Sequence, residues 1–388
     1  MEKEPSIIRR LPRILGEHAQ SEPALFCMPA HKGRGLAFFR EGLAGWDVSA
    51  SWLRGHGDPI RDIERRYSLF YQTADSFLLT CGRASALRVM LRALPKKERV
   101  IVPEGCDGDM HSGLVRAGLK ASVLKTGSDP GMGRYRMPEP EEIAETLDRT
   151  GAGTVFLQSP DVYGYCANLP NIAEVAHSRG ALLMVDASFG PHFPISGRLP
   201  DPAALYADIV CHCPFTGLNA LNQSVAIHLN PCRVDAETLR RLTEEEDPDP
   251  SSLILASMDW ALHSASEKTW ETHLDFLMEI LQKIDALPGL RTLRGPALKG
   301  SADHDASRIV IDASGRKLTG AAVMRLLEGR NIHAERADGN RILLITGPED
   351  DPYWYTRLLE ALSELPEGCA KPKGLHDRKG RAAETTDE

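Results

Sequence analysis

The sequence lacks several features that would assign it to a specialised class of protein. It has no apolar run of membrane-spanning length, and its first ten residues, MEKEPSIIRR, lack the apolar stretch of a secretory signal. Its net charge of −8 lacks the basic excess that favours nucleic acid or an anionic membrane as a partner. With 42% hydrophobic and 26% charged residues, it is typical of a soluble globular protein, and we expect it to be cytoplasmic.

The eight cysteines lack the spacing of a disulfide framework and of paired zinc ligands. Cys211, His212 and Cys213 are adjacent, but in a strand the two cysteines share one face and the histidine points the other way. We therefore expect reduced, buried thiols and no metal site. A role for Cys106 or Cys213 beside a functional site stays open.

Short apolar runs alternate with amphipathic segments between residues 98 and 229. Strand-like runs such as RVIVPEG, TVFLQSP and ALLMVDAS are separated by helix-like segments of 10 to 15 residues. This alternation predicts an α/β fold with a mostly parallel sheet and helices on both faces. The nearly continuous apolar runs indicate strands that are buried on both sides.

The remaining segments predict a large domain at 46–250, preceded by an N-terminal arm at 1–45. The polar stretch 243–252 is typical of a loop, and apolar spacing predicts one long helical stretch from Leu253 to about Leu287, within a connecting segment at 251–290. Strand, helix, strand, strand and helix then predict a small α+β domain at 291–368, with Thr319 near the start of its first helix. The tail at 369–388 has almost no large apolar residue and should be disordered.

Polar residues follow several strands at the edge where open parallel sheets bind ligands. Cys81 and Gly82 follow one strand and lead into a helix, and a glycine turn at a helix N-terminus suits a phosphate. An ordinary strand-to-helix turn is the alternative. Asp186 ends another strand and needs a partner, either a neighbouring side chain or a protonated ligand nitrogen. The pattern therefore favours a phosphate-bearing cofactor without naming it.

Several ordered motifs resemble a known family. They are CMPAHKGRG (27–35), HGDPIRDIE, SFLLTCGRASAL, SPDVYGYCANLPNIAEVAHSRGALLMVDASFGPHF and PSSLILASMDWA. From about Leu25 to Pro366 the chain resembles the Orn/Lys/Arg decarboxylase-like proteins, which are pyridoxal-phosphate lyases of fold type I. The resemblance implies a fold-type-I, PLP-transferase-like large domain with a small C-terminal domain, pyridoxal phosphate as cofactor, and a homodimer.

The sequence departs from this family where the cofactor would be held. No lysine lies between Lys125 and Lys268, and the loop PFTG places Thr216 at the Schiff-base lysine position and Phe215 at the preceding histidine. Asp107 stands where a histidine stacks on the cofactor ring. The family's phosphate turn becomes Gly82, Arg83, Ala84 and Ser85, whereas Ser159, Asp186 and His192 are retained. His31, in the first motif, is either an acid–base group or an interface hydrogen-bonding residue.

These departures leave three functional hypotheses. The leading one is a pseudoenzyme that has lost covalent pyridoxal chemistry, acting alone or in a heterodimer with a lysine-bearing paralogue, because a threonine hydroxyl cannot replace the lysine amine. The second is an active lyase in which Asp186 and Arg83 hold non-covalent pyridoxal or pyridoxamine phosphate. The third is a binding module for a phosphorylated metabolite. Equally, Arg83 and Asp186 could pair with each other as polar packing.

Overall fold

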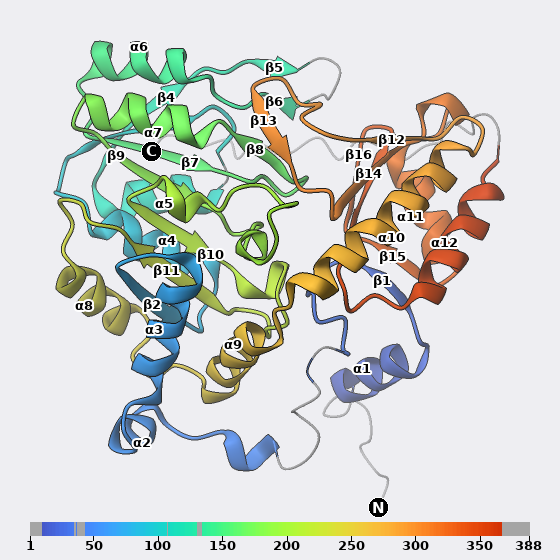
Figure 1. Ribbon diagram of the computed structural model, residues 1–388, viewed down its shortest axis with the longest axis horizontal. Helices are drawn as coiled ribbons and strands as arrows, with labels where there is room; N and C mark the ends of the chain where they lie inside the picture. Colours follow the sequence, from blue (N-terminus) through green and yellow to red (C-terminus); the bar gives the residue numbers. More distant parts are fainter. Residues whose placement is uncertain (1–9, 35, 37–42, 107, 130–133, 367–388) are drawn as a thin grey trace, which may run out of the picture.

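The computed structural model describes residues 10–34, 36, 43–106, 108–129 and 134–366. Its centre is a seven-stranded sheet in the order β2-β11-β10-β9-β7-β3-β4 (Figure 1). All neighbouring strands run parallel except that β11 is antiparallel to both β10 and β2. The predicted α/β fold is therefore confirmed. The strands are β2 (Asp75–Leu79), β3 (Arg99–Pro103), β4 (Lys120–Leu124), β7 (Thr154–Gln158), β9 (Leu182–Asp186), β10 (Ile209–His212) and β11 (Val225–Leu229).

Helices cover both faces of this sheet and create a hydrophobic core on each side. Successive residues of β9 alternate between the cores, with Leu182 and Met184 in one and Leu183 and Val185 in the other. This confirms the predicted burial on both faces, which gives nearly continuous apolar runs. One face packs against α4 (Arg83–Arg92), α5 (Gly108–Ala117) and α8 (Ala236–Glu246), and the other against α3 (Pro59–Tyr71), α6 (Pro140–Thr150) and α7 (Leu169–Ser178).

A second, antiparallel sheet of four strands has the order β12-β14-β17-β16 and contributes a third core with three helices. Thr319 caps the N-terminus of α11 by accepting a hydrogen bond from the Ala322 amide, as its predicted place at the helix start requires. The elements are β12 (Arg291–Leu293), β14 (Arg308–Asp312), β16 (Arg336–Asp338), β17 (Arg341–Ile345), α10 (Glu267–Asp285), α11 (Gly320–Glu328) and α12 (Pro352–Ser363).

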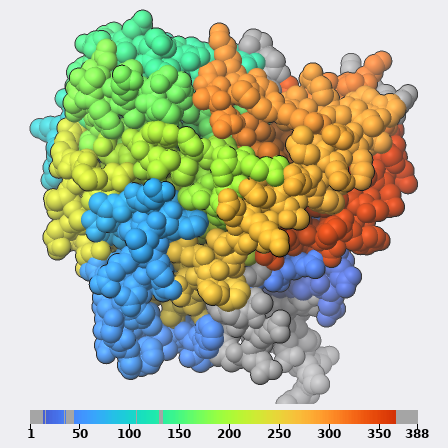
Figure 2. Space-filling model, in the orientation of Figure 1, coloured from blue at the N-terminus to red at the C-terminus, as the bar shows by residue number. Residues whose placement is uncertain are grey.

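Two strand pairs join distant parts of the chain across the predicted domain boundaries, which themselves stay predictions. β1 (Ala24–Phe26) pairs in parallel with β15 (Ile332–Ala334), and β13 (Ser301–His304) pairs antiparallel with β8 (Tyr165–Ala167). Figure 2 shows the orange segment that contains β13 packed against the green part of the chain. The other elements are α1 (Arg10–Gln20), α2 (Ala50–Gly55), β5 (Ser128–Asp129), β6 (Arg134–Tyr135) and short 3-10 helices at Leu43–Trp46, Phe193–Ile195, Ala203–Leu205, Pro214–Thr216 and Ser314–Arg316.

Two details of the predicted helices were wrong. The stretch from Leu253 to Leu287 is two helices, α9 (Ser252–Ser264) and α10, because Ser266 is extended and its side chain caps α10 through the Thr269 amide. The predicted loop at 243–252 starts too early, since α8 continues to Glu246. The predicted disordered tail lies outside the described residues, as does Asp107. Among the described helices, none is both long and apolar enough to cross a membrane.

Candidate functional site

The predicted site lies where the carboxyl ends of β2, β7 and β9 meet the N-terminus of α4. Gly82 has a φ of +88°, which glycine adopts without strain, and α4 begins at the next residue. This geometry turns the chain sharply from β2 into α4, so that the Arg83 side chain starts beside the carboxyl ends of the strands. The predicted glycine turn therefore exists, and its chemistry depends on what Arg83 contacts.

Arg83 contacts the buried carboxylate of Asp186. Its Nε donates to Asp186 Oδ2 at 2.8 Å and its Nη2 donates to the same oxygen, whereas Nη1 lies 3.3 Å from Asp109 Oδ2. The Asp186 side chain is 0% exposed and that of Arg83 is 17% exposed. Of the alternatives left open by the sequence, the structure has the mutual pair: the Asp186 carboxylate is neutralised by Arg83.

Other donors complete the shell around Asp186. Gln158 Nε2 donates to Oδ2 at 3.2 Å. The Ser188 amide donates to Oδ1 at 3.1 Å, the Ser188 hydroxyl donates to the same oxygen, and Cys211 Sγ lies 3.4 Å from it. Both carboxylate oxygens are therefore engaged, as a fully buried charge requires. Gln158, Ser188 and Cys211 were missed as site residues, although Gln158 also ends a parallel strand and Ser188 follows one.

The other residues of the predicted phosphate turn are also committed to local contacts. Ser85 Oγ donates to the Cys81 carbonyl at 3.2 Å and accepts from Arg88 Nη2 at 2.6 Å. Arg88 in turn donates from Nε to Glu246 Oε1 at 2.9 Å on α8. Ala84 brings no side-chain donor. Through Ser85 and Arg88, this turn therefore helps to hold α4 against α8, and it also faces the carboxyl ends of the strands.

Thr216 is buried and its hydroxyl is used within the protein. Thr216 Oγ1 lies 2.6 Å from the Ser188 carbonyl and 3.0 Å from the Cys213 carbonyl, so it is held as a packing group. Phe215 packs against the core on the α4 side, and its carbonyl accepts from the Ala30 amide at 2.9 Å. Burial raises the pKa of the Cys213 thiol to about 12, so this cysteine is neutral at physiological pH.

Ser159 and His192 hold the surrounding loops. Ser159 Oγ accepts from the Ala167 amide at 3.0 Å. His192 is fully buried, stacks on Trp270 at a centroid distance of 4.5 Å, and places Nε2 3.1 Å from Asp305 Oδ2. Burial opposes ionisation of Asp305, but His192 and then Arg308 hold the pKa of its carboxyl well below the usual value. His192 is thus a fully buried group that lies beside the Asp305 carboxylate.

His31 does not join this cluster. Its Nδ1 accepts from the Gly33 amide at 3.0 Å, and burial, helped by the neighbouring Lys32, lowers its pKa to about 4. Lys32 itself is buried, and its Nζ donates to the Cys27 carbonyl at 2.6 Å and the Ile345 carbonyl at 3.0 Å. Lys32 is therefore held in place by these two backbone carbonyls.

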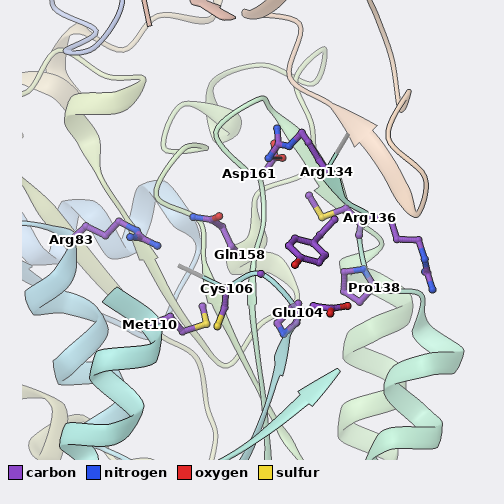
Figure 3. A pocket seen from close by; sticks show the side chains of 13 residues that line it. Arg83, Glu104, Cys106, Met110, Arg134, Arg136, Pro138, Gln158 and Asp161 are labelled. Atoms are coloured by element: carbon purple, nitrogen blue, oxygen red, sulfur yellow. Dashed lines mark ion pairs between the residues drawn. The ribbon is translucent and has the colours of Figure 1, made fainter. Parts of the chain in front are cut away.

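A cavity of about 240 Å³ is lined on one side by Arg83 (Figure 3). Arg83, Cys106 and Gln158 line the side nearest the pair, and Arg134, Asp161 and Arg136 line the opposite side. Cys106 thus faces a cavity, whereas Cys211 in β10 and Cys213 just after it are buried in the same core, and His212 stacks on Tyr71 on the other face of the sheet. No cluster of three or more potential metal ligands occurs among the described residues.

Solved structures with a similar architecture define the fold class. The constitutive lysine decarboxylase of E. coli matches with a TM-score of 0.69 at 17% identity, covering 91% of this chain and 60% of its own. The ureidoglycine-glyoxylate aminotransferase of Bacillus subtilis matches with a TM-score of 0.65 at 13% identity, covering 88% of this chain and 92% of its own. The fold is that of the fold-type-I pyridoxal-phosphate enzymes, as predicted, and the chain spans about 60% of the length of the lysine decarboxylase.

Sequence comparison narrows this class to one family. The model of the Orn/Lys/Arg decarboxylase major domain matches residues 11–295. An arginine decarboxylase of Bacillus subtilis is 24% identical over 386 residues, covering 94% of this chain and 78% of its own, and the uncharacterized protein YaaO of the same organism is 27% identical over 358 residues, covering 86% and 72%. The chain belongs to the Orn/Lys/Arg decarboxylase family.

The family is pyridoxal-phosphate-dependent, but the residues present here do not fit covalent binding of that cofactor. Thr216 offers no amine, and its hydroxyl is bound to backbone carbonyls. The Asp186 carboxylate, which would meet a protonated ring nitrogen, already receives Arg83, Gln158 and Ser188. A ring could reach Asp186 only after Arg83 had left it.

Proposed function

We propose that this protein is a pseudoenzyme of the Orn/Lys/Arg decarboxylase family, with a structural or regulatory role in place of pyridoxal-dependent decarboxylation. The observation that carries the proposal is the occupation of Asp186 by Arg83. Separating one partner of a buried ion pair costs on the order of 3–5 kcal/mol, so a cofactor that displaced Arg83 would lose roughly a hundredfold or more in affinity.

Titration with pyridoxal phosphate, followed by visible absorbance and by calorimetry, tests this proposal. The arginine decarboxylase of Bacillus subtilis, which is similar in sequence, serves as the positive control. We expect neither the absorbance of a Schiff base nor saturable heat. Decarboxylation of arginine, lysine or ornithine by the purified protein, at a rate that depends on added pyridoxal phosphate, would contradict the proposal.

A heterodimer with a lysine-bearing paralogue is one form of this role, and a homodimer is the other. Size-exclusion chromatography with light scattering, after affinity purification from the native host, separates them. Co-purification of the paralogue in equal amount supports the heterodimer. A tight homodimer that contains no paralogue excludes it.

The alternative of an active lyase with non-covalent pyridoxal or pyridoxamine phosphate requires Asp186 and Arg83 to be available for the cofactor. Their mutual pairing disfavours it. An Asp186→Ala variant whose cofactor affinity equals that of the wild type would exclude it. The third function, binding of a phosphorylated metabolite at the former phosphate turn, is disfavoured because Ser85 is bound to Cys81 and Arg88, and a thermal-shift panel of phosphorylated metabolites tests it.

A further inference from the structure

The loop at residues 214–219 lies between two parts of the protein. It belongs to the connection from β10 to β11 of the seven-stranded sheet. Facing it are residues 24–34 and 305–365, which we call the small unit because they contain β1, β14 to β17, α11 and α12, whose apolar residues share one core. Figure 1 shows the small unit beside the seven-stranded sheet. The loop, which contains Thr216, is therefore placed to bind both parts.

Two residues of this loop hydrogen-bond directly to segments that follow strands of the small unit. The Phe215 carbonyl accepts from the Ala30 amide at 2.9 Å, and Asn219 Nδ2 donates to Glu349 Oε1 at 2.9 Å. Ala30 follows β1 and Glu349 follows β17, two strands that are far apart in sequence. The small unit thus holds the loop at two separate points.

Arg308 adds a third link, from the central part of the small sheet. It is the first residue of β14, where its backbone pairs with Ile345 of β17. Its Nη2 donates to the Thr216 carbonyl and to the Phe189 carbonyl, at 3.0 Å in both cases. One guanidinium group therefore joins the small unit to the loop that follows β10 and to the loop that follows β9.

The charge of Arg308 is balanced at a junction that is closed to water. Arg308 Nε lies 3.3 Å from Asp305 Oδ2, and His192 Nε2 lies 3.1 Å from the same oxygen. Each of these three side chains is at most 1% exposed. Asp305 is also fixed through its backbone, because its amide donates to the Gly164 carbonyl at 2.9 Å. The ion pair is therefore buried where the two parts meet.

Movement of the small unit away from the seven-stranded sheet would break these contacts together. Parts of a chain that meet at a polar interface commonly move relative to each other. Here that movement would take the Arg308 donor from the Phe189 and Thr216 carbonyls and its cation from Asp305, which is costly in a buried site. The two parts should therefore stay together until the protein unfolds.

We propose that loop 214–219 and Arg308 form a clamp that fixes the small unit to the seven-stranded sheet, so that the two open and unfold as one body. The clamp goes beyond the proposed function and does not depend on it. It gives the loop at the Schiff-base lysine position a conformational role, that of coupling two parts of the fold.

Hydrogen–deuterium exchange of the full chain, read by mass spectrometry of peptides, tests the clamp. Peptides from β7 and β9 report on the seven-stranded sheet, and peptides from β14 and β17 report on the small unit. In the wild type we expect the slowest amides of both sets to be protected to the same extent, within about threefold, because they become exposed in one opening event. A wild-type difference of more than about tenfold would overturn the proposal without any variant.

Three variants test which contacts provide the coupling. Arg308→Lys keeps a positive charge beside Asp305 but has one nitrogen in place of a planar fork, so it cannot make all the contacts of the guanidinium group. Asn219→Ala is a milder change that removes the bond to Glu349. Arg291→Lys is the control on β12, because that side chain is 70% exposed. Circular dichroism and urea unfolding show whether each variant is folded.

In Arg308→Lys we expect the amides of β14 and β17 to exchange at least about tenfold faster than those of β7 and β9, because the small unit then opens separately. Asn219→Ala should shift exchange in the same direction by about threefold, and Arg291→Lys should leave the two sets equal. Equal exchange of the two sets in a folded Arg308→Lys variant would overturn the proposal. If Arg308→Lys does not fold, equal exchange in Asn219→Ala would overturn it instead.

Discussion

Replacing Arg83 with methionine should destabilise the protein more than most single substitutions. The change removes the charge that faces Asp186, which is 0% exposed. Loss of one partner of a buried ion pair costs roughly 3–5 kcal/mol. Because Gln158 and Ser188 still donate to the carboxylate and Arg83 is partly exposed, we expect the low end, about 3 kcal/mol.

Urea unfolding, followed by circular dichroism and tryptophan fluorescence, measures this loss as a change in the free energy of unfolding. The double variant Arg83→Met with Asp186→Asn removes both charges and should recover about 2 kcal/mol relative to the single variant, since no unpaired charge remains. Arg179→Met, which removes the exposed partner of Asp148, is the matched control and should change little. A loss below about 1 kcal/mol in Arg83→Met would refute the reasoning that Arg83 neutralises Asp186.

Three further predictions concern other buried positions. Burial, with a smaller effect of His192, lowers the pKa of His212 from 6.5 to about 3, so between these values the unfolded chain binds a proton that the folded chain does not. Stability should fall as pH drops from 6 to 4, and His212→Phe should reduce the slope in urea titrations by about 1.4 kcal/mol per pH unit; an unchanged slope would contradict the low pKa. Thr216→Lys should give no Schiff-base absorbance with pyridoxal phosphate while Arg83 still holds Asp186, and a visible absorbance band would count against that block. Gly320→Ala should cost about 2 kcal/mol or more in urea unfolding, because its Cβ would lie 1.9 Å from the Arg341 carbonyl oxygen, whereas Gly329→Ala, with 3.5 Å to its nearest atom, should be nearly neutral.

The sheet was predicted well from the sequence. Successive residues of its central strands face two different cores, so these strands are apolar at nearly every position. The break between α9 and α10 was missed because the apolar spacing continues through it. Two extended residues, Ala265 and Ser266, separate the helices, and Ser266 caps the second one; apolar spacing carries no signal for a cap.

The site was predicted in part. Strand ends and motifs located Arg83, Asp186 and Thr216. Whether the Arg83 side chain contacts Asp186 or an anion depends on the direction in which it points, and the sequence does not show this because the two residues are far apart in the chain. The ion pair of Arg134 with Asp161 was missed because β6 has two residues, too few for any period, and Asp161 lies in another segment.

The pairing of β1 with β15 imposes an order on synthesis at the ribosome. Leu25 faces His333, and the Phe26 ring packs at 5.0 Å from Tyr355, so the first strand emerges roughly 300 residues before its partners. At ~5–20 residues per second, this segment waits roughly 15–60 s. During that time the Phe26 side chain, which is fully buried in the folded protein, is exposed to chaperones and to other nascent chains, and β1 cannot pair until residues 332–334 have been synthesised.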